Sequence, residues 1–107
     1  MSQFDQVSVI KKANVYFDGK CISHTVICPH DVRKTIGVIL PSTLTFNTTV
    51  PEVMEGIGGT CRVRLQGEME WKEYGEGSFF KIPGNSSFEI EVAPGEAYHY
   101  VCHFGSD

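Results

Sequence analysis

Short runs of alternating apolar and polar residues recur along this chain, and turn-forming residues separate them. Residues 88–92 read Phe-Glu-Ile-Glu-Val, and residues 61–65 read Cys-Arg-Val-Arg-Leu. Strict alternation over such a length predicts a β-strand that buries one face and leaves the other in water. Arg62 and Arg64 are therefore expected on the solvent-facing side of their strand.

Further segments have the composition of strands, because they are rich in β-branched and aromatic residues. They cover residues 14–19, 20–28, 35–40, 43–47, 52–57, 79–82 and 98–104, and residues 67–71 form a turn and the start of another strand. In residues 20–28 the pattern places Cys21, Ser23, Thr25 and Ile27 on one face. About nine or ten short strands, with no helix, indicate a sandwich or a barrel.

The length of 107 residues favours one domain. Residues 1–13 fit either a short helix or a loose strand, so we treat them as an N-terminal arm of uncertain structure, and we expect the domain to cover residues 14–107. Residues 1–6 have neither a basic stretch nor an apolar stretch, so no secretory signal is predicted.

Charge and hydropathy exclude two classes of partner. The net charge is −4, and no block of Lys and Arg occurs, whereas proteins that bind nucleic acid usually carry a basic surface. No apolar run approaches the roughly 20 residues that span a bilayer, so no membrane association is predicted. The four cysteines lack a paired spacing, and we expect reduced thiols, with Cys61 and Cys102 as small core residues.

Two spaced motifs carry the first family resemblance. Gly77 is followed after five residues by Pro83, and Glu52 is followed after six residues by Gly59. This layout resembles the two sequence motifs of cupin β-barrels. The histidines that bind metal in many cupins are absent, because their positions hold Phe46 and Thr48 (or Thr45 and Asn47) and Phe88. One carboxylate is too few ligands for a transition metal, so no metal site is predicted.

A longer ordered set of residues narrows the resemblance to one family. The chain resembles the small pyrimidine/purine nucleoside phosphorylases over roughly residues 14–104, although it departs at Gly56-Ile-Gly58. The set consists of Tyr16-Phe-x-Gly-Lys20, Arg33-x-Thr35-x-Gly37-Val38, Phe46-x-Thr48, Pro51-Glu52-x-Met54, Gly59, Trp71, Gly77-x-x-Phe80, Ile82-Pro83, Ser87-Phe88 and Tyr100-x-Cys102.

The resemblance implies an all-β, single-domain cupin-type jelly-roll β-barrel. It also implies a pentosyltransferase that cleaves purine and pyrimidine nucleosides with inorganic phosphate, giving a free base and a pentose 1-phosphate. No cofactor is implied, and phosphate is the co-substrate. The family leads us to expect a cytoplasmic homodimer.

Four polar residues are candidates for the chemistry that this reaction needs. Arg33 can grip phosphate oxygens in a bidentate fork, and the hydroxyls of Thr35 and Thr48 can assist. Glu52 holds the motif position that points into the barrel, where it can bind the ribose, stabilise positive charge on the sugar or supply a proton. The alternatives are a solvated Arg33 beside Asp31, a strand-edge charge at Glu52, and threonines that serve only as β-formers.

Three aromatic residues, Phe46, Phe80 and Phe88, are predicted to form apolar walls on which a base can stack. They are equally suited to an ordinary core, since the wall of a pocket is itself part of the core. The alternative function for the whole chain is a non-catalytic, small-molecule-binding cupin, because the fold serves both roles. Phosphate-dependent release of a base from a nucleoside separates the two functions.

Overall fold

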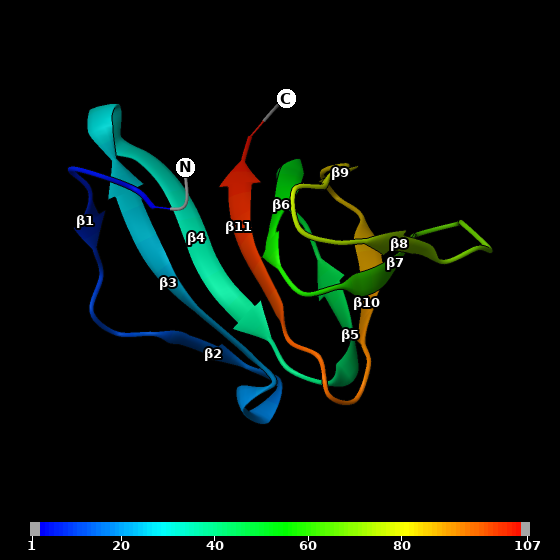
Figure 1. Cartoon of the computed structure of the whole chain (residues 1–107). Helices are drawn as coiled ribbons and strands as arrows, with labels where there is room; N and C mark the ends of the chain where they lie inside the picture. The colour runs from blue at the N-terminus through cyan, green and yellow to red at the C-terminus, as the bar shows by residue number, and fades with distance from the viewer. Residues whose placement is uncertain (1–2, 106–107) are drawn as a thin grey trace.

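A computed structural model describes residues 3–105 of the protein, so residues 1 and 2 of the predicted arm and residues 106 and 107 of the predicted domain lie outside it (Figure 1). The described part consists of β-strands and two single 3₁₀ turns, at Phe17–Gly19 and Pro29–Asp31. The strands are β1 Ser8–Val9, β2 Asn14–Tyr16, β3 Cys21–Cys28, β4 Val32–Ile39, β5 Ser42–Asn47, β6 Glu52–Gly58, β7 Cys61–Leu65, β8 Lys72–Tyr74, β9 Phe79–Ile82, β10 Ser87–Val92 and β11 Tyr98–Phe104.

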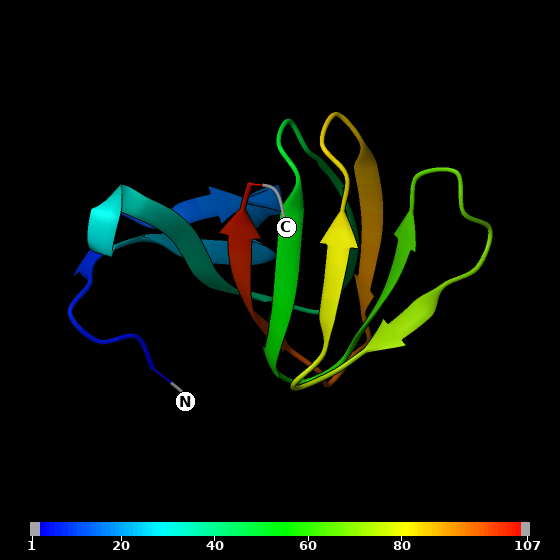
Figure 2. The ribbon, with the colours of Figure 1, turned by 90° about the horizontal axis from the view of Figure 1, so that it is seen from above.

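The strands form two antiparallel sheets that curve around a common interior (Figures 1 and 2). The large sheet has the order β1-β3-β4-β11-β6-β9, with β2 paired to β3 as well, and the small sheet has the order β5-β10-β7-β8. This arrangement confirms the predicted jelly roll. Within residues 3–105 no strand ladder joins one sheet to the other, so the structure is two facing sheets rather than one closed barrel.

The alternation read from the sequence places the core correctly on most strands. Phe88, Ile90 and Val92 of β10 are at most 3% exposed and face Tyr98, Tyr100 and Cys102 of β11 in one cluster. Cys61 and Cys102 are buried, as predicted, and the four cysteines are free thiols. Because β9 ends at Ile82, Pro83 terminates this strand as expected.

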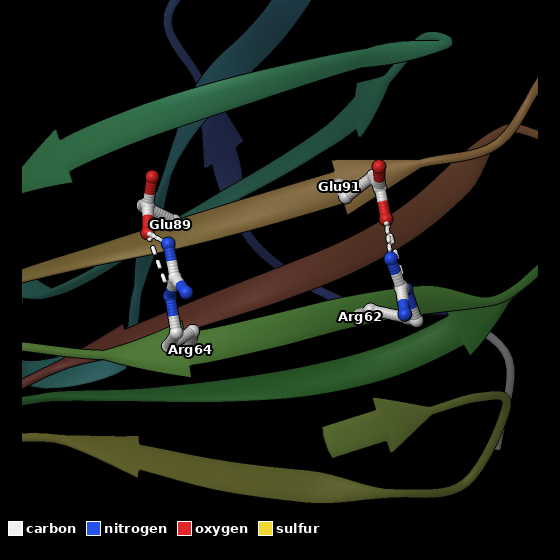
Figure 3. A network of polar contacts seen from close by, with 4 residues as sticks. All are labelled: Arg62, Arg64, Glu89 and Glu91. Atoms are coloured by element: carbon white, nitrogen blue, oxygen red, sulfur yellow. Dashed lines mark hydrogen bonds and ion pairs between the residues drawn. The ribbon is translucent and has the colours of Figure 1, made fainter. Parts of the chain in front are cut away.

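The outer face of the small sheet carries the two predicted solvent-facing arginines. Arg62 pairs with Glu91, and Arg64 lies 2.5 Å from Glu89, so each pair joins the neighbouring strands β7 and β10 (Figure 3). Both guanidinium groups also lie over the ring of Trp71, at 5.3 and 4.7 Å from its centre. Exposed ion pairs of this kind contribute little to stability. Their charges make the outer face of the small sheet hydrophilic.

Burial is uneven along two strands of the large sheet. On β3, Cys21 and Ser23 are buried as expected, but farther along it is Val26 that is buried, at 1% exposure, while Thr25 and Ile27 are half-buried. The change occurs where β1 pairs with this end of β3, opposite Val26 and Ile27. On β9, Phe79 points outward and is 58% exposed.

The part of the N-terminal arm that is described follows the edge of the large sheet (Figure 1). Ser8 and Val9 pair with one end of β3, and Asn14 to Tyr16 pair with its other end. The backbone N–H of Ile10 donates to the carbonyl oxygen of Thr25 at 2.9 Å. These bonds satisfy backbone groups that an unpaired edge of β3 would otherwise leave free.

Steric crowding explains why the residue that closes the Glu52 motif is a glycine. Gly59 adopts a φ of +75°, and a Cβ atom there would lie 1.8 Å from the carbonyl oxygen of Ala97. The turn after β6 therefore packs directly against the chain that leads into β11. Only glycine combines that backbone conformation with that approach.

Candidate active site

A cavity of about 220 Å³ lies between the two sheets. This is smaller than the ~300–1,000 Å³ of pockets for drug-sized ligands, so it suits a small ligand. Its two walls differ in chemistry. The large sheet contributes the polar side chains of Ser23, Thr35, Glu52, Tyr100 and Cys102 and the apolar side chains of Ile39, Met54 and Phe104. The small sheet contributes Phe46 and Phe88, with Asn47 at the end of β5.

Strand register brings the polar side chains together on the large sheet. Thr35 of β4 pairs with Cys102 of β11, and the next inward residue of β11, Phe104, pairs with Glu52 of β6. The Cys102 Sγ atom donates to Glu52 Oε1 at 3.5 Å. Because these residues belong to three adjacent strands, the backbone ladders fix their relative positions.

Burial controls the protonation of these groups. Loss of contact with water raises the pKa of Glu52, and the hydrogen bond from Cys102 acts in the opposite direction. Burial, followed by the nearby Glu52 carboxyl, raises the pKa of the Cys102 thiol well above its usual range. The cavity therefore contains a neutral thiol beside a carboxyl group that keeps its proton to a higher pH than an exposed glutamate.

The phenol of Tyr100 completes the polar wall. It is 7% exposed, and its hydroxyl lies 3.4 Å from the Sγ atom of Cys21. Burial raises the pKa of Tyr100 far above its usual value, so the phenol stays neutral. A neutral hydroxyl can both donate and accept hydrogen bonds, so Tyr100 can bond a polar ligand in either sense.

The aromatic wall consists of stacked rings. The rings of Phe46 and Phe88 lie 5.5 Å apart and are inclined by 19°. Phe17 meets Phe46 edge to face at 5.2 Å. Phe80 lies behind this wall, since it contacts Phe88 and Tyr74 and does not line the cavity.

Four of the predicted site residues line the cavity together: Thr35, Phe46, Glu52 and Phe88. Thr48 has a different environment. Its hydroxyl donates to the carbonyl oxygen of Pro83 at 2.7 Å and accepts from the backbone N–H of Ser86 at 3.1 Å. It is 5% exposed and connects the turn after β5 to the turn before β10. These bonds give Thr48 a structural role.

Arg33 is exposed and does not line the cavity. It lies on β4 two residues before Thr35, so both side chains start from the same face of the sheet. Along β11, Cys102 lies opposite Thr35 of β4, and Phe104, two residues later, lies opposite Glu52 of β6. Arg33, two residues before Thr35 on the antiparallel strand β4, is therefore at the same end of the sheet as Glu52. Arg33 therefore belongs to the rim of the cavity, outside its lining.

Several lining residues were not proposed as site residues from the sequence. The sequence predicts Cys102 as a small core residue, and the structure places it both in the core and on the cavity, beside Tyr100. Tyr16, Ser23, Met54 and Phe104 also line the space. Alternation on β11 identified the inward face, but it could not separate inward residues that touch another side chain from those that border an empty space.

The residues that the structure describes contain no group of three His, Cys, Asp or Glu side chains close enough to hold a metal ion. Glu52 is the carboxylate among the residues that line the cavity, and its neighbour Cys102 already donates to it. No helix within residues 3–105 is long and apolar enough to cross a membrane.

Comparisons with solved structures establish the fold. A protein of unknown function from Acinetobacter sp. ADP1 is 52% identical, with a TM-score of 0.94, and the match covers 97% of this chain and 99% of that one. The cupin domain of a transcriptional regulator from Enterobacter cloacae is 12% identical, with a TM-score of 0.66 over 82% of this chain and 98% of that one. This likeness confirms a cupin-type fold.

Comparisons with named proteins establish the family. A protein from Dechloromonas aromatica named pyrimidine/purine nucleoside phosphorylase is 70% identical over 98% of this chain and 100% of its own length. A protein of the same name from Thiobacillus denitrificans is 67% identical over the same shares. The family model for pyrimidine/purine nucleoside phosphorylase matches residues 11–104. The chain therefore belongs to the pyrimidine/purine nucleoside phosphorylase family.

Proposed function

We propose that the protein is a pentosyltransferase that cleaves purine and pyrimidine nucleosides with inorganic phosphate. The observation that carries this proposal is the pairing of the two walls, with a carboxyl group on one sheet and stacked phenylalanines on the other. The names of the relatives support the reaction. The products are a free base and a pentose 1-phosphate.

The reaction exchanges one bond at the anomeric carbon of the sugar. A phosphate oxygen forms the new C–O bond while the C–N bond to the base breaks, and the electron pair of that bond leaves with the base. Positive charge develops on the sugar in the transition state. The base gains a proton, and hydrogen phosphate loses one, so the balance closes without a cofactor.

Glu52 is the proposed catalytic residue and donates the proton to the leaving base. Burial raises the pKa of this carboxyl group, which favours the protonated form that a general acid needs. After the transfer the carboxylate faces a positively charged sugar, which it stabilises. The hydrogen phosphate then supplies the proton that restores the acid.

The aromatic wall is the proposed binding surface for the base. Phe46 and Phe88 present ring faces and edges, and a ring stacks on any base without reading its hydrogen-bonding edge. This property suits a broad range of purine and pyrimidine nucleosides. Phe80 supports Phe88 from behind, so its contribution to the substrate is indirect.

Arg33 and Thr35 are the proposed phosphate contacts, and Arg33→Ala is expected to raise the KM for phosphate by about tenfold, the value of one charge-assisted hydrogen bond. The KM for the nucleoside should change little. Steady-state kinetics at varied phosphate measures this. Arg62→Ala is the matched control, because Arg62 lies on the outer face of the small sheet. An effect of Arg33→Ala on the nucleoside alone would remove it as the anchor.

The decisive assay mixes the purified protein with uridine or inosine and follows release of free base. Release that requires phosphate, with formation of a pentose 1-phosphate, is the expected result. Binding of nucleoside without turnover would instead support the non-catalytic binding function. No turnover of any nucleoside in the presence of phosphate contradicts the proposal.

A homodimer is a further proposal that follows from the family resemblance. Exposed apolar side chains remain on the described monomer, among them the consecutive residues Val15, Tyr16 and Phe17 at 60%, 49% and 43% exposure. Apolar surface of this kind is typical of protein contacts when it is contiguous. Light scattering on the purified protein measures its mass, and a monomer at assay concentration would contradict the proposal.

A further inference from the structure

The contact between the Cys102 thiol and the Glu52 carboxyl group has a consequence for the proposed reaction. We propose that Cys102 is a positioning residue, whose S–H group occupies Oε1 of Glu52 and leaves Oε2 to carry the proton for the leaving base. The inference rests on the proposed function. It assigns a task to a residue that its burial alone would classify as core.

The geometry favours a fixed contact. Cys102 is 5% exposed, and its Sγ atom lies 3.5 Å from Glu52 Oε1, an ordinary length for a hydrogen bond with sulfur. Both residues lie in paired strands, since β11 bonds to β4 on one side and to β6 on the other. A cysteine side chain has a single rotatable bond before its sulfur, so its position is well determined.

The direction of the hydrogen bond follows from the protonation of the thiol. Burial, together with the neighbouring Glu52, raises the pKa of Cys102, so the sulfur keeps its hydrogen and acts as the donor. Oε1 is then an acceptor. The carbonyl oxygen of a protonated carboxyl group is a better acceptor than its hydroxyl oxygen, so this contact favours a proton on Oε2.

Other titratable groups near Glu52 act from different sides. Tyr100 of β11 is neutral and borders the same cavity, and the exposed Lys81 of β9 borders a neighbouring hollow that Glu52 also lines. Arg33 of β4 lies on the rim. Cys102 is the hydrogen-bond partner of the Glu52 side chain within residues 3–105.

The first test compares a variant that lacks the donor with one that keeps it. Cys102→Ala should lower kcat/KM by about tenfold, chiefly through kcat, because the acid is no longer oriented. Cys102→Ser, which keeps a donor, should recover most of the rate. Cys61→Ala is the control, since Cys61 is 3% exposed but lies on β7 and does not line the cavity. Equal losses for Cys61→Ala and Cys102→Ala would overturn the inference.

The second test does not depend on catalysis. Carbon-13 NMR of labelled glutamate side chains follows the titration of Glu52, and Cys102→Ala should raise its pKa, because the thiol bond favours the ionised form. Cys61→Ala should leave that pKa unchanged. If Cys102→Ala does not fold, Cys102→Val removes the donor and leaves no cavity, because its two methyl groups fill the space of the sulfur. An unchanged Glu52 titration in the folded variant overturns the positioning role.

The two proposals fail in different ways. A wild-type protein without phosphorolysis would remove the proposed function, and the NMR titration would still show whether the thiol holds the carboxyl group. An active wild-type enzyme whose Cys102→Ala variant keeps its rate and its Glu52 titration would remove the positioning role alone.

Discussion

Glu52→Gln is expected to lower kcat/KM for phosphorolysis by about 10³-fold, within the usual contribution of a general acid. Glutamine keeps the size and the hydrogen-bonding capacity of the side chain but has no acidic proton to give to the leaving base. It also cannot become a carboxylate beside the charged sugar. Steady-state kinetics with inosine and phosphate measures the loss.

Glu55→Gln is the matched control for this substitution. Glu55 lies on the same strand, β6, but on the opposite face of the sheet, where its Oε1 atom lies 2.9 Å from Nε2 of His103. The control variant should keep its activity. Thermal unfolding should be little changed for Glu52→Gln, since a neutral side chain replaces one whose ionisation burial opposes. A kcat/KM equal to that of the wild type would remove Glu52 from the mechanism.

Gly59→Ala is expected to cost about 2–5 kcal/mol of unfolding free energy, from the positive φ and from forced displacement of packed backbone. Its φ is +75°, and an added Cβ atom would lie 1.8 Å from the Ala97 carbonyl oxygen. Domains of this kind are stable by only about 5–15 kcal/mol, so the variant should lose a large share of its stability. Denaturant unfolding measures the change.

Gly77→Ala separates the two causes. Gly77 has a similar φ of +83°, but no atom lies within 4 Å of the position of an added Cβ. Only the backbone strain remains there, about 1–2 kcal/mol. If both variants lose the same stability, close packing of Gly59 against Ala97 does not explain why the motif requires glycine.

The sequence predicted the fold well because period-two alternation and turn residues are local signals. Residues 88–92 and 61–65 occupy β10 and β7 with the predicted faces buried. Alternation does not describe burial where a neighbouring strand covers the other face, as at Val26, which is buried where β1 joins β3. No local signal describes which strand lies beside another.

The sequence predicted only part of the candidate site, because motif spacing is also a local signal. Glu52 and Phe88 were found from motif spacing, and the structure places both on the cavity. Thr48 and Phe80 also point inward. The Thr48 hydroxyl donates a hydrogen bond that joins two turns, and Phe80 packs behind Phe88. Which inward residues border empty space depends on the distance between the two facing sheets. The spacing of residues along one strand carries no information about the distance between sheets.

The absence of a strand ladder between the sheets has a consequence for the size of the ligand. In the described residues the two walls of the cavity belong to separately bonded sheets, joined by the turns of the chain and by side-chain packing. Their separation can change by a small amount without breaking a backbone hydrogen bond. For the proposed reaction, we expect the slot to widen for a two-ring base and to narrow for a one-ring base, so that one set of residues would serve both.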